Sequence, residues 1–185
     1  MLTITHDDAP RPLLTPEDQH VPSRIRRLRE LGIGLGAEPV PAFDEAARAL
    51  ARVAGTPWAA VTFVDAHRQF FAGLHDPEGE ARPRLTARDH GFCPYVVVRG
   101  KALVLDDVND YPRFAGNPVV QEDGVRSYLG APLLDPSGLA LGTISVVDRM
   151  PRPWGRRGLE TIKAAAAELT ERILAAAPPG AADAD

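Results

Sequence analysis

Hydrophobic residues between positions 42 and 54 recur at the spacing of one helical face. They follow the i, i+3, i+4, i+7 pattern, which predicts an amphipathic helix over this segment. Asp44 and Glu45 fall in its first turn, where the positive end of the helix dipole favours carboxylates. Gly55 and Pro57 follow the last apolar residue, so the pattern also predicts where the helix ends.

A second long helix is predicted near the C-terminus, from about residue 156 to 177. Its apolar positions lie three and four residues apart, as in the seam of a short coiled coil: Leu159, Ile162, Ala166, Leu169 and Ile173. Such a stripe either covers the core or the 42–54 helix of its own chain, or pairs with a second copy. The spacing alone leaves both alternatives open.

A shorter helix is predicted over residues 23–31, where apolar residues lie three apart and Gly32 follows as a stop. Its other face is rich in arginine: Arg24, Arg26, Arg27 and Arg29. Such a stripe can meet an acidic partner, but a charged stripe on a short helix is usually solvated. We therefore expect these arginines to face water.

Five segments have the composition of strands: 58–64, 69–74, 102–105, 127–134 and 139–147. The short polar links at 65–68 and 135–138 predict two hairpins. Residues 92–98 form an apolar run that fits a helix or a strand, and Asp89 as an N-cap favours a short helix. Residues 76–90 are polar and irregular, as in loops that line a site.

This order of elements predicts an α+β fold in which helices flank a central antiparallel sheet of five to six strands. Proline and polar residues without a sustained period predict a disordered N-terminal arm over residues 1–21. Composition predicts a disordered tail over 178–185. A single domain is expected over residues 22–177, including its N- and C-terminal helices.

Composition narrows the range of partners. The chain carries a net charge of -4 with a pI near 5.7, so it offers no large basic field for nucleic acid or an anionic bilayer. No apolar run approaches the roughly 20 residues that a membrane span needs. The N-terminus, with His6, Asp7 and Asp8, lacks the apolar core of a signal peptide. We therefore expect a cytoplasmic protein that binds neither nucleic acid nor membrane.

Six pieces of the sequence form an ordered pattern. The three longest are LDDVNDYPRFAGNP at 105–118, VRSYLGAPL at 125–133 and GLALGTISVVDRMPRPW at 138–154. The others are Thr56 with Pro57, VDAHRQFF at 64–71, and Phe92 with Cys93. In this order they resemble a GAF domain over residues 42–175, of the branch that bacteria attach to histidine kinases and cyclic dinucleotide enzymes.

The resemblance implies a GAF/PAS-like fold and a sensory role in signal transduction. No output domain follows in this sequence, so we expect a stand-alone domain that binds a small molecule and signals through a partner protein. The expected partners are a second copy, joined through the terminal helices, and a histidine kinase or other regulator of a two-component system. The alternative is a dimerisation adaptor whose interior is filled by its own side chains.

By the same resemblance, a ligand would enter a cavity between the sheet and the 86–125 segment. The expected site residues are Phe92, Cys93, Tyr95, Asp106, Arg113, Phe114, Tyr128 and Ser145. Asp106 is expected to pair with Arg113 or to cap a turn, and the Ser145 hydroxyl needs a hydrogen-bond partner. Gly130 and Gly142, inside strand patterns, indicate bulges or close approach of another backbone.

Catalytic machinery is not evident in the sequence. Cys93 is the single cysteine, which excludes an internal disulfide, and free cysteine usually packs as a small apolar residue. His90, three residues earlier, adds too few ligands for a metal site. Motifs for cyclic nucleotides, phosphate loops, nucleophile elbows and HExxH sites are missing. We therefore expect no enzyme, no metal and no assignable cofactor; a redox enzyme using Cys93 is the less favoured alternative.

Overall fold

The computed structural model describes residues 15–36, 38–79 and 82–178. These residues form one antiparallel sheet of six strands in the order β3-β2-β1-β6-β5-β4. The strands are β1 (Trp58–Val64), β2 (Arg68–His75), β3 (Leu85–Ala87), β4 (Leu103–Leu105), β5 (Ser127–Leu134) and β6 (Ala140–Asp148). The predicted α+β class is confirmed, and both predicted hairpins are present as β1–β2 and β5–β6.

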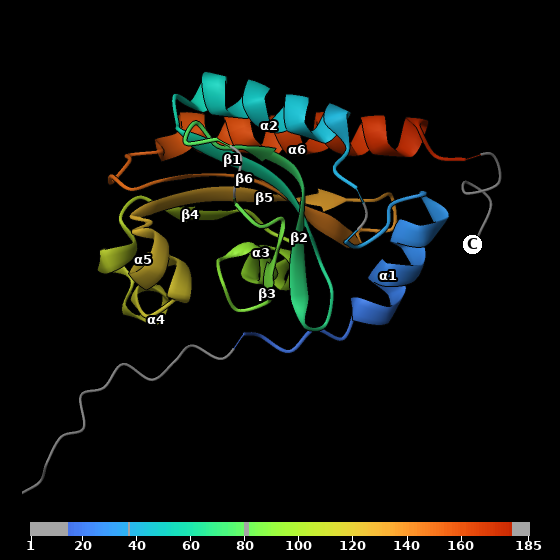
Figure 1. Ribbon diagram of the computed structural model, residues 1–185, viewed down its shortest axis with the longest axis horizontal. Coiled ribbons are helices and arrows are strands. Elements are labelled where there is room, and N and C mark those ends of the chain that lie inside the picture. The colour runs from blue at the N-terminus through green and yellow to red at the C-terminus, as the bar shows by residue number, and fades with distance from the viewer. Residues whose placement is uncertain (1–14, 37, 80–81, 179–185) are drawn as a thin grey trace, which may run out of the picture.

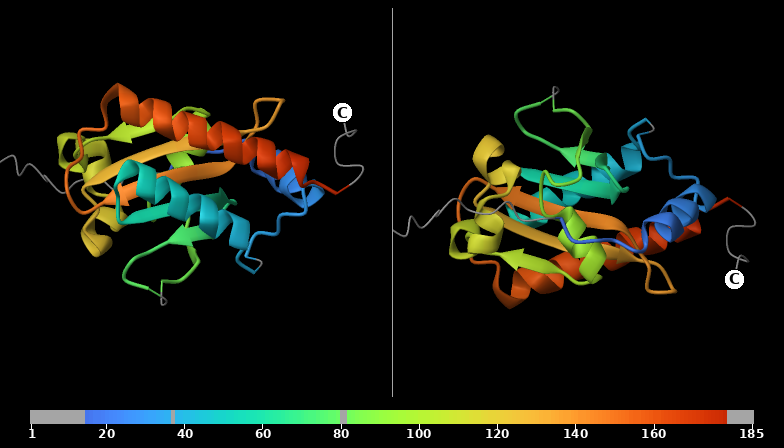
Figure 2. Two further views of the ribbon diagram at one scale, coloured as in Figure 1. Left: turned by 90° about the horizontal axis from the view of Figure 1, so that it is seen from above. Right: turned by 90° about the horizontal axis from the view of Figure 1, so that it is seen from below.

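Helices cover both faces of this sheet (Figure 1). They are α1 (Val21–Glu30), α2 (Pro41–Ala54), α3 (Cys93–Arg99), α4 (Pro112–Ala115), α5 (Pro118–Asp123) and α6 (Gly155–Ala175), with a 3₁₀ turn, η1, at Val108–Asp110. Helices α2 and α6 lie side by side across one face, as Figure 2 shows from above. Helices α3, α4 and α5 lie on the opposite face. The molecule therefore has three layers.

The layer of α2 and α6 buries the main apolar core against β1, β5 and β6. In α6 the residues Ile162, Ala166, Leu169 and Ile173 are all buried, and Leu159 packs partly buried at the edge of the same cluster. The stripe therefore packs within its own chain, which decides between the two alternatives left by its spacing. A dimer through the terminal helices would have to use other faces of them.

Glycines allow close approach between neighbouring strands and between the sheet and α2. A side chain at Gly142 in β6 would run into the backbone oxygen of Thr62 and the ring of Phe63 on β1. A side chain at Gly73 in β2 would likewise run into the backbone of Phe43 in α2. The close approach predicted at Gly142 is thus present, and any larger residue there would push adjacent strands apart.

Part of the segment 76–90, predicted as an irregular loop, forms a strand. It contains β3, which pairs with β2 at the sheet edge. Asp89 does not cap α3, contrary to the sequence analysis: Phe92 is the N-cap residue, without a side-chain cap, and proline follows in the first turn. Gly91, at a φ of 128°, turns the chain between Asp89 and the helix, and Asp89 lies three residues before the N-cap position.

The arginines of α1 are not uniformly solvated. The Arg24 side chain is 1% exposed and its Nε donates to the carbonyl oxygen of Ala140 at 2.7 Å. Its Nη1 donates to Asp18 Oδ2 at 2.7 Å, and Arg88 Nη2 donates to the same oxygen at 3.0 Å. For Arg24 the expectation of a solvated face is wrong, because a buried carboxylate and a carbonyl satisfy its charge and donors.

This contact also revises part of the predicted disordered arm. Asp18 falls within the 1–21 segment, yet its side chain is only 4% exposed and is held between two arginines. Residues 15–21 of the predicted arm are described and α1 begins at Val21, whereas residues 1–14 of the arm and nearly all of the predicted tail, 179–185, lie outside the described residues. Disorder over residues 1–14 and 179–185 therefore stays a prediction.

We predict that Asp18→Asn lowers the free energy of unfolding by about 3 kcal/mol at pH 7, because it leaves Arg24 buried without its counter-ion. Urea denaturation would measure this, with Glu17→Gln as the exposed control. Burial alone would raise the pKa of Asp18, but hydrogen bonds and charge from Arg24 and Arg88 lower it overall. The stabilisation that ionised Asp18 gives the wild type is therefore complete above about pH 4. It is lost as the pH falls through the lower pKa that Asp18 has in the folded state. Equal stabilities of Asp18→Asn and wild type at pH 7 would contradict this role of Asp18.

Candidate ligand cavity and family membership

A cavity of about 320 Å³ lies between the sheet and the layer that contains α3 and α5. Its walls are mostly apolar. The sheet contributes Trp58, Ala60, Phe71, Leu74 and Val147, and the covering segments contribute Pro83, Phe92, Val119 and Val125. A concave, mainly apolar site of this size with a few polar groups is typical of small-molecule binding.

The inner wall carries Tyr128 on β5, which is 2% exposed. Its hydroxyl lies 3.7 Å from the Cys93 thiol. Burial raises the pKa of Tyr128 well above its usual value, the Cys93 thiol acts in the same direction, and a hydrogen bond with Ser145 opposes them. The phenol therefore stays neutral near pH 7 and remains able to donate a proton in a hydrogen bond.

Gly130 makes room for this tyrosine. A Cβ atom at position 130 would overlap the hydroxyl end of the Tyr128 side chain. Gly130 also lies opposite Ser145 in the β5–β6 register. The missing side chain at Gly130 thus sets the shape of the inner wall. The sequence predicted a bulge or the close approach of another backbone here, whereas the group that approaches is the Tyr128 side chain.

Two buried amide side chains fix the segment that covers the cavity. Gln69 on β2 donates from Nε2 to the carbonyl oxygens of Ala87, Arg88 and His90 at 2.9–3.1 Å. Asn117 accepts from the backbone N–H of Gly91 at 2.9 Å and donates to the Gly91 carbonyl at 2.9 Å. Buried amides with several partners of this kind specify one loop conformation. The covering segment is therefore held from both sides.

Alternating charges follow the mouth of the cavity. Arg82 donates to Asp76 at 3.0 Å and to Asp123 at 3.0 Å, and Asp123 lies 2.7 Å from His90 Nε2. Burial alone would raise the pKa of Asp123, but the hydrogen bond with His90 and the charge of Arg82 lower it overall. Asp76 also accepts from Trp58 Nε1 at 2.9 Å. These contacts tie the end of β2 to α5 across the mouth.

Four of the eight expected site residues line this cavity: Phe92, Cys93, Tyr128 and Ser145. Tyr95 and Phe114 lie in an adjacent aromatic cluster, with ring centroids 5.2 Å apart, and Arg113 lies over the Phe114 ring at 4.9 Å. Burial raises the pKa of Tyr95. These three belong to the packing of α3 on α4 and not to the cavity wall.

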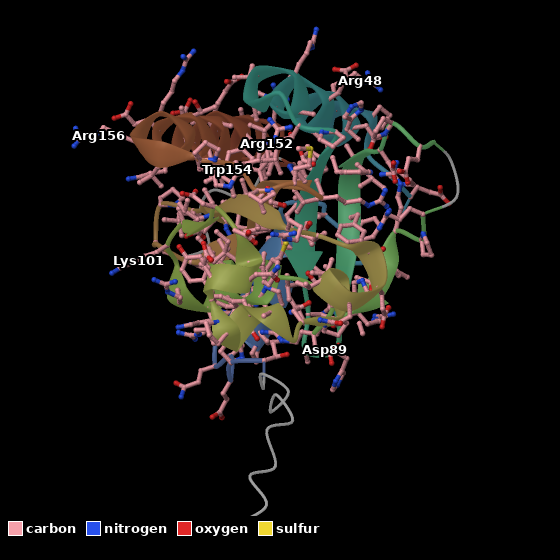
Figure 3. The ribbon with its side chains drawn as sticks, turned by 90° about the vertical axis from the view of Figure 1, so that its left-hand side faces the viewer. Arg48, Asp89, Lys101, Arg152, Trp154 and Arg156 are labelled. Carbon is pink, nitrogen blue, oxygen red and sulfur yellow. The ribbon has the colours of Figure 1, made fainter. Side chains whose placement is uncertain are left out.

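Asp106, the eighth expected residue, has a structural role elsewhere. It does not pair with Arg113; its carboxylate accepts from the backbone N–H of Trp154 at 3.1 Å. Trp154 Nε1 in turn donates to the carbonyl oxygen of Leu105 at 3.2 Å. Figure 3 shows Trp154 beside the start of α6 and Asp89 far from it, on the other side of the sheet. Asp106 therefore joins β4 to α6.

Five residues that line the cavity or hold its cover were not predicted from the sequence: Gln69, Arg82, Asn117, Asp123 and Arg149. Three of them, Arg82, Asn117 and Asp123, lie in the segments 76–90 and 86–125, which were expected to line the site. His90, considered with Cys93 as a metal ligand, instead pairs with Asp123 and lies 3.7 Å from Glu122. Within the described residues, no three histidine, cysteine or acidic side chains gather as a metal site. None of the described helices has the length and apolar character of a membrane span.

The sequence profile of the GAF domain matches residues 38–173. The chain belongs to the GAF domain family. Its structure resembles a methyl-accepting chemotaxis protein, with a TM-score of 0.62 and 18% identity, over 83% of this chain and 95% of that one. It also resembles a free methionine-R-sulfoxide reductase of Neisseria meningitidis, with a TM-score of 0.58 and 16% identity, over 87% and 93% of the two chains.

A curated relative is a cyclic di-GMP phosphodiesterase of Pseudomonas aeruginosa, 35% identical over 161 residues. The alignment covers 85% of this GAF chain but only 26% of that enzyme. These comparisons correct the expectation that the chain is not an enzyme. A relative in sequence and a neighbour in fold both carry the names of enzymes, so the lack of familiar catalytic motifs does not exclude catalysis.

We predict that Asn117→Ala loosens the cavity cover without unfolding the domain. The change removes the Asn117 acceptor of the Gly91 N–H, which is then left with the Asp89 carbonyl at 3.1 Å, and this costs about 1 kcal/mol. Hydrogen–deuterium exchange should show faster exchange of the Gly91 amide, while amides of β1 and β6 remain protected. Gln121→Ala is the matched control, because Gln121 is exposed and donates only to the Ala115 carbonyl. An unchanged Gly91 amide in Asn117→Ala would contradict this role.

Proposed function

We propose that this GAF domain is a sensory module that binds a small molecule in the cavity between the sheet and the α3–α5 layer. The observation that carries the proposal is the cavity itself, a mainly apolar chamber of about 320 Å³ with polar groups at its inner wall and its mouth. A filled interior would offer no such chamber.

Strand β5 provides a direct route by which occupancy can reach the helical layer. Tyr128 points to the cavity, whereas the next residue, Leu129, packs in the core against the α2–α6 side. A Cβ atom at Gly158 of α6 would lie 3.5 Å from the Leu129 side chain. A ligand that shifts Tyr128 therefore acts through one peptide unit on the surface that supports α6. This coupling supports a signal carried by that helix.

The proposed output is a change in contact with a partner protein. The relative named as a cyclic di-GMP phosphodiesterase supports an enzyme of that class as the regulated partner, and a histidine kinase is the partner expected from the family resemblance. A second copy is the further proposed partner, through the helix faces that α2 and α6 leave outside their shared core.

We predict that Ala60→Phe fills the cavity and prevents ligand retention. Ala60 lies on the cavity wall opposite Ser145 in the β1–β6 register. Native mass spectrometry of protein purified from its own source should show a small adduct on wild type and on the control Ala60→Ser, but not on Ala60→Phe. A ligand present at about 100 times its Kd should also stabilise the two binding forms by about 2.7 kcal/mol. If no adduct appears on any form and no metabolite raises the Tm of the wild type, the adaptor alternative replaces the proposal.

A second candidate function rests on the position of Cys93 in the cavity wall, next to the Tyr128 hydroxyl. A thiol placed there can reduce a bound sulfoxide: the sulfur of Cys93 takes up the oxygen and becomes a sulfenic acid, and the substrate leaves as a sulfide. An external dithiol then reduces the sulfenic acid and releases water. The chain needs this external reductant because its sequence holds one cysteine.

The reductase candidate predicts that Cys93→Ser abolishes turnover of free methionine sulfoxide with dithiothreitol as the reductant, since serine cannot be oxidised in this way. The assay follows methionine formation in wild type, in Cys93→Ser and in the variant Ser137→Ala, which lies outside the cavity. Equal rates in wild type and Cys93→Ser would remove this candidate and leave the sensory proposal untouched.

A further inference from the structure

The acidic side chains at the cavity mouth are fully engaged by their own neighbours. Asp76 accepts hydrogen bonds from Trp58, from Arg82 and from the backbone N–H of Glu78. Asp123 accepts from Arg82 and faces His90 at 2.7 Å. A cationic ligand would have to displace buried or half-buried partners to reach either carboxylate. The mouth is therefore poorly suited to a ligand cation.

The two arginines at the mouth differ in how strongly they are held. Arg82 is 31% exposed and is fixed between two aspartates. Arg149 lies on the cavity wall, and its Nη1 donates to Glu78 at 2.7 Å. The side chains of Arg149 and Glu78 are 43% and 55% exposed. Exposed ion pairs of this kind contribute about 0–1 kcal/mol, so a competing anion can replace Glu78 at little cost.

Arg149 is also held in position for such an exchange. Its guanidinium lies 4.6 Å from the ring centroid of Trp58, and its Nε donates to the carbonyl oxygen of Asp123 at 2.9 Å. Among the described residues, its Nη2 has no hydrogen-bond partner. A guanidinium anchored by ring stacking and a carbonyl offers its remaining donors to an anion without further ordering of the side chain.

We propose that the ligand of the cavity is a small aromatic or other apolar molecule with one anionic group, whose body fills the cavity and whose anion binds Arg149. This inference rests on the proposed sensory function and adds the chemical class of the ligand. The apolar walls favour the body of such a molecule. The anion takes the place of the Glu78 carboxylate on Arg149, which makes Glu78 a competitor for the site.

Two fluorescent probes with one aromatic skeleton test this. 1-Anilinonaphthalene-8-sulfonate carries a sulfonate, and N-phenyl-1-naphthylamine lacks it. Wild type should bind the sulfonate with a single saturable site and at least about fivefold tighter than the neutral probe. Arg149→Gln should weaken sulfonate binding about tenfold and change binding of the neutral probe less than about twofold. Arg149→Lys should restore part of the loss, because it keeps the charge but not the planar fork.

One further variant should strengthen sulfonate binding, and another should leave it unchanged. Glu78→Gln should strengthen sulfonate binding about twofold, because it removes the competing carboxylate. Arg113→Gln is the matched control: this arginine lies over Phe114, outside the cavity, and its loss should alter neither titration. Raising the salt concentration should weaken binding of the sulfonate alone.

The outcomes separate the two levels of the proposal. If both probes bind equally and Arg149→Gln changes neither, the anionic ligand class is wrong while the cavity remains a binding site. If neither probe binds, or if Ala60→Phe leaves both titrations unchanged, the cavity is not the site, and the proposed function fails together with the inference. Equal losses of sulfonate binding in Arg149→Gln and Arg113→Gln would assign the effect to overall charge and overturn the role of Arg149.

Discussion

Two buried amides, Gln69 and Asn117, hold the segment 87–91 in place over the cavity. Ala87 ends β3, and the residues after it leave the sheet before α3 begins at Cys93. Gln69 satisfies three carbonyls of the segment from the sheet side, and Asn117 satisfies Gly91 from the α5 side. Buried backbone groups without partners are costly, so these amide contacts stabilise this one path of the segment.

The segment 87–91 and the start of α3 together position the chemistry at both ends of the cavity. His90 reaches Asp123 at the mouth, and Cys93 reaches Tyr128 at the inner wall. These two side chains are only three residues apart, on opposite sides of the start of α3. A sensor of a small molecule and an enzyme that reduces a small molecule make similar demands on such a cavity. Both need an apolar space of defined shape with a few fixed polar groups. This is why the fold accommodates both candidates.

Most of the fold was predictable from the sequence because its elements are locally encoded. The period of 3.6 residues in α2 and α6 and the two polar hairpin links marked those elements within a few residues of their observed bounds. The short strand β3 was missed because three residues carry no period, and its pairing with β2 depends on the sheet. The N-cap assigned to Asp89 failed because the turn at Gly91 intervenes.

The candidate site was predictable only in part, because its members come from distant positions. Phe92, Cys93, Tyr128 and Ser145 were proposed from a family resemblance and line the cavity. Arg82 meets Asp123 across 41 positions, a pairing that no local pattern contains. Asp106 and Arg113 looked like polar site residues, yet their neighbours in space are a backbone N–H and a phenylalanine ring.

The pair of arginines that enclose Asp18 has a practical meaning for where this domain begins. A fragment cut at residue 22, the boundary that the sequence suggested, would retain Arg24 and Arg88 in the protein interior and discard the carboxylate that neutralises them. The backbone carbonyl of Arg88 accepts from Gln69, which lines the cavity, so Arg88 is also tied to the cavity cover. The N-terminal border of the folded unit is therefore linked, through Asp18 and Arg88, to the segment that covers the cavity.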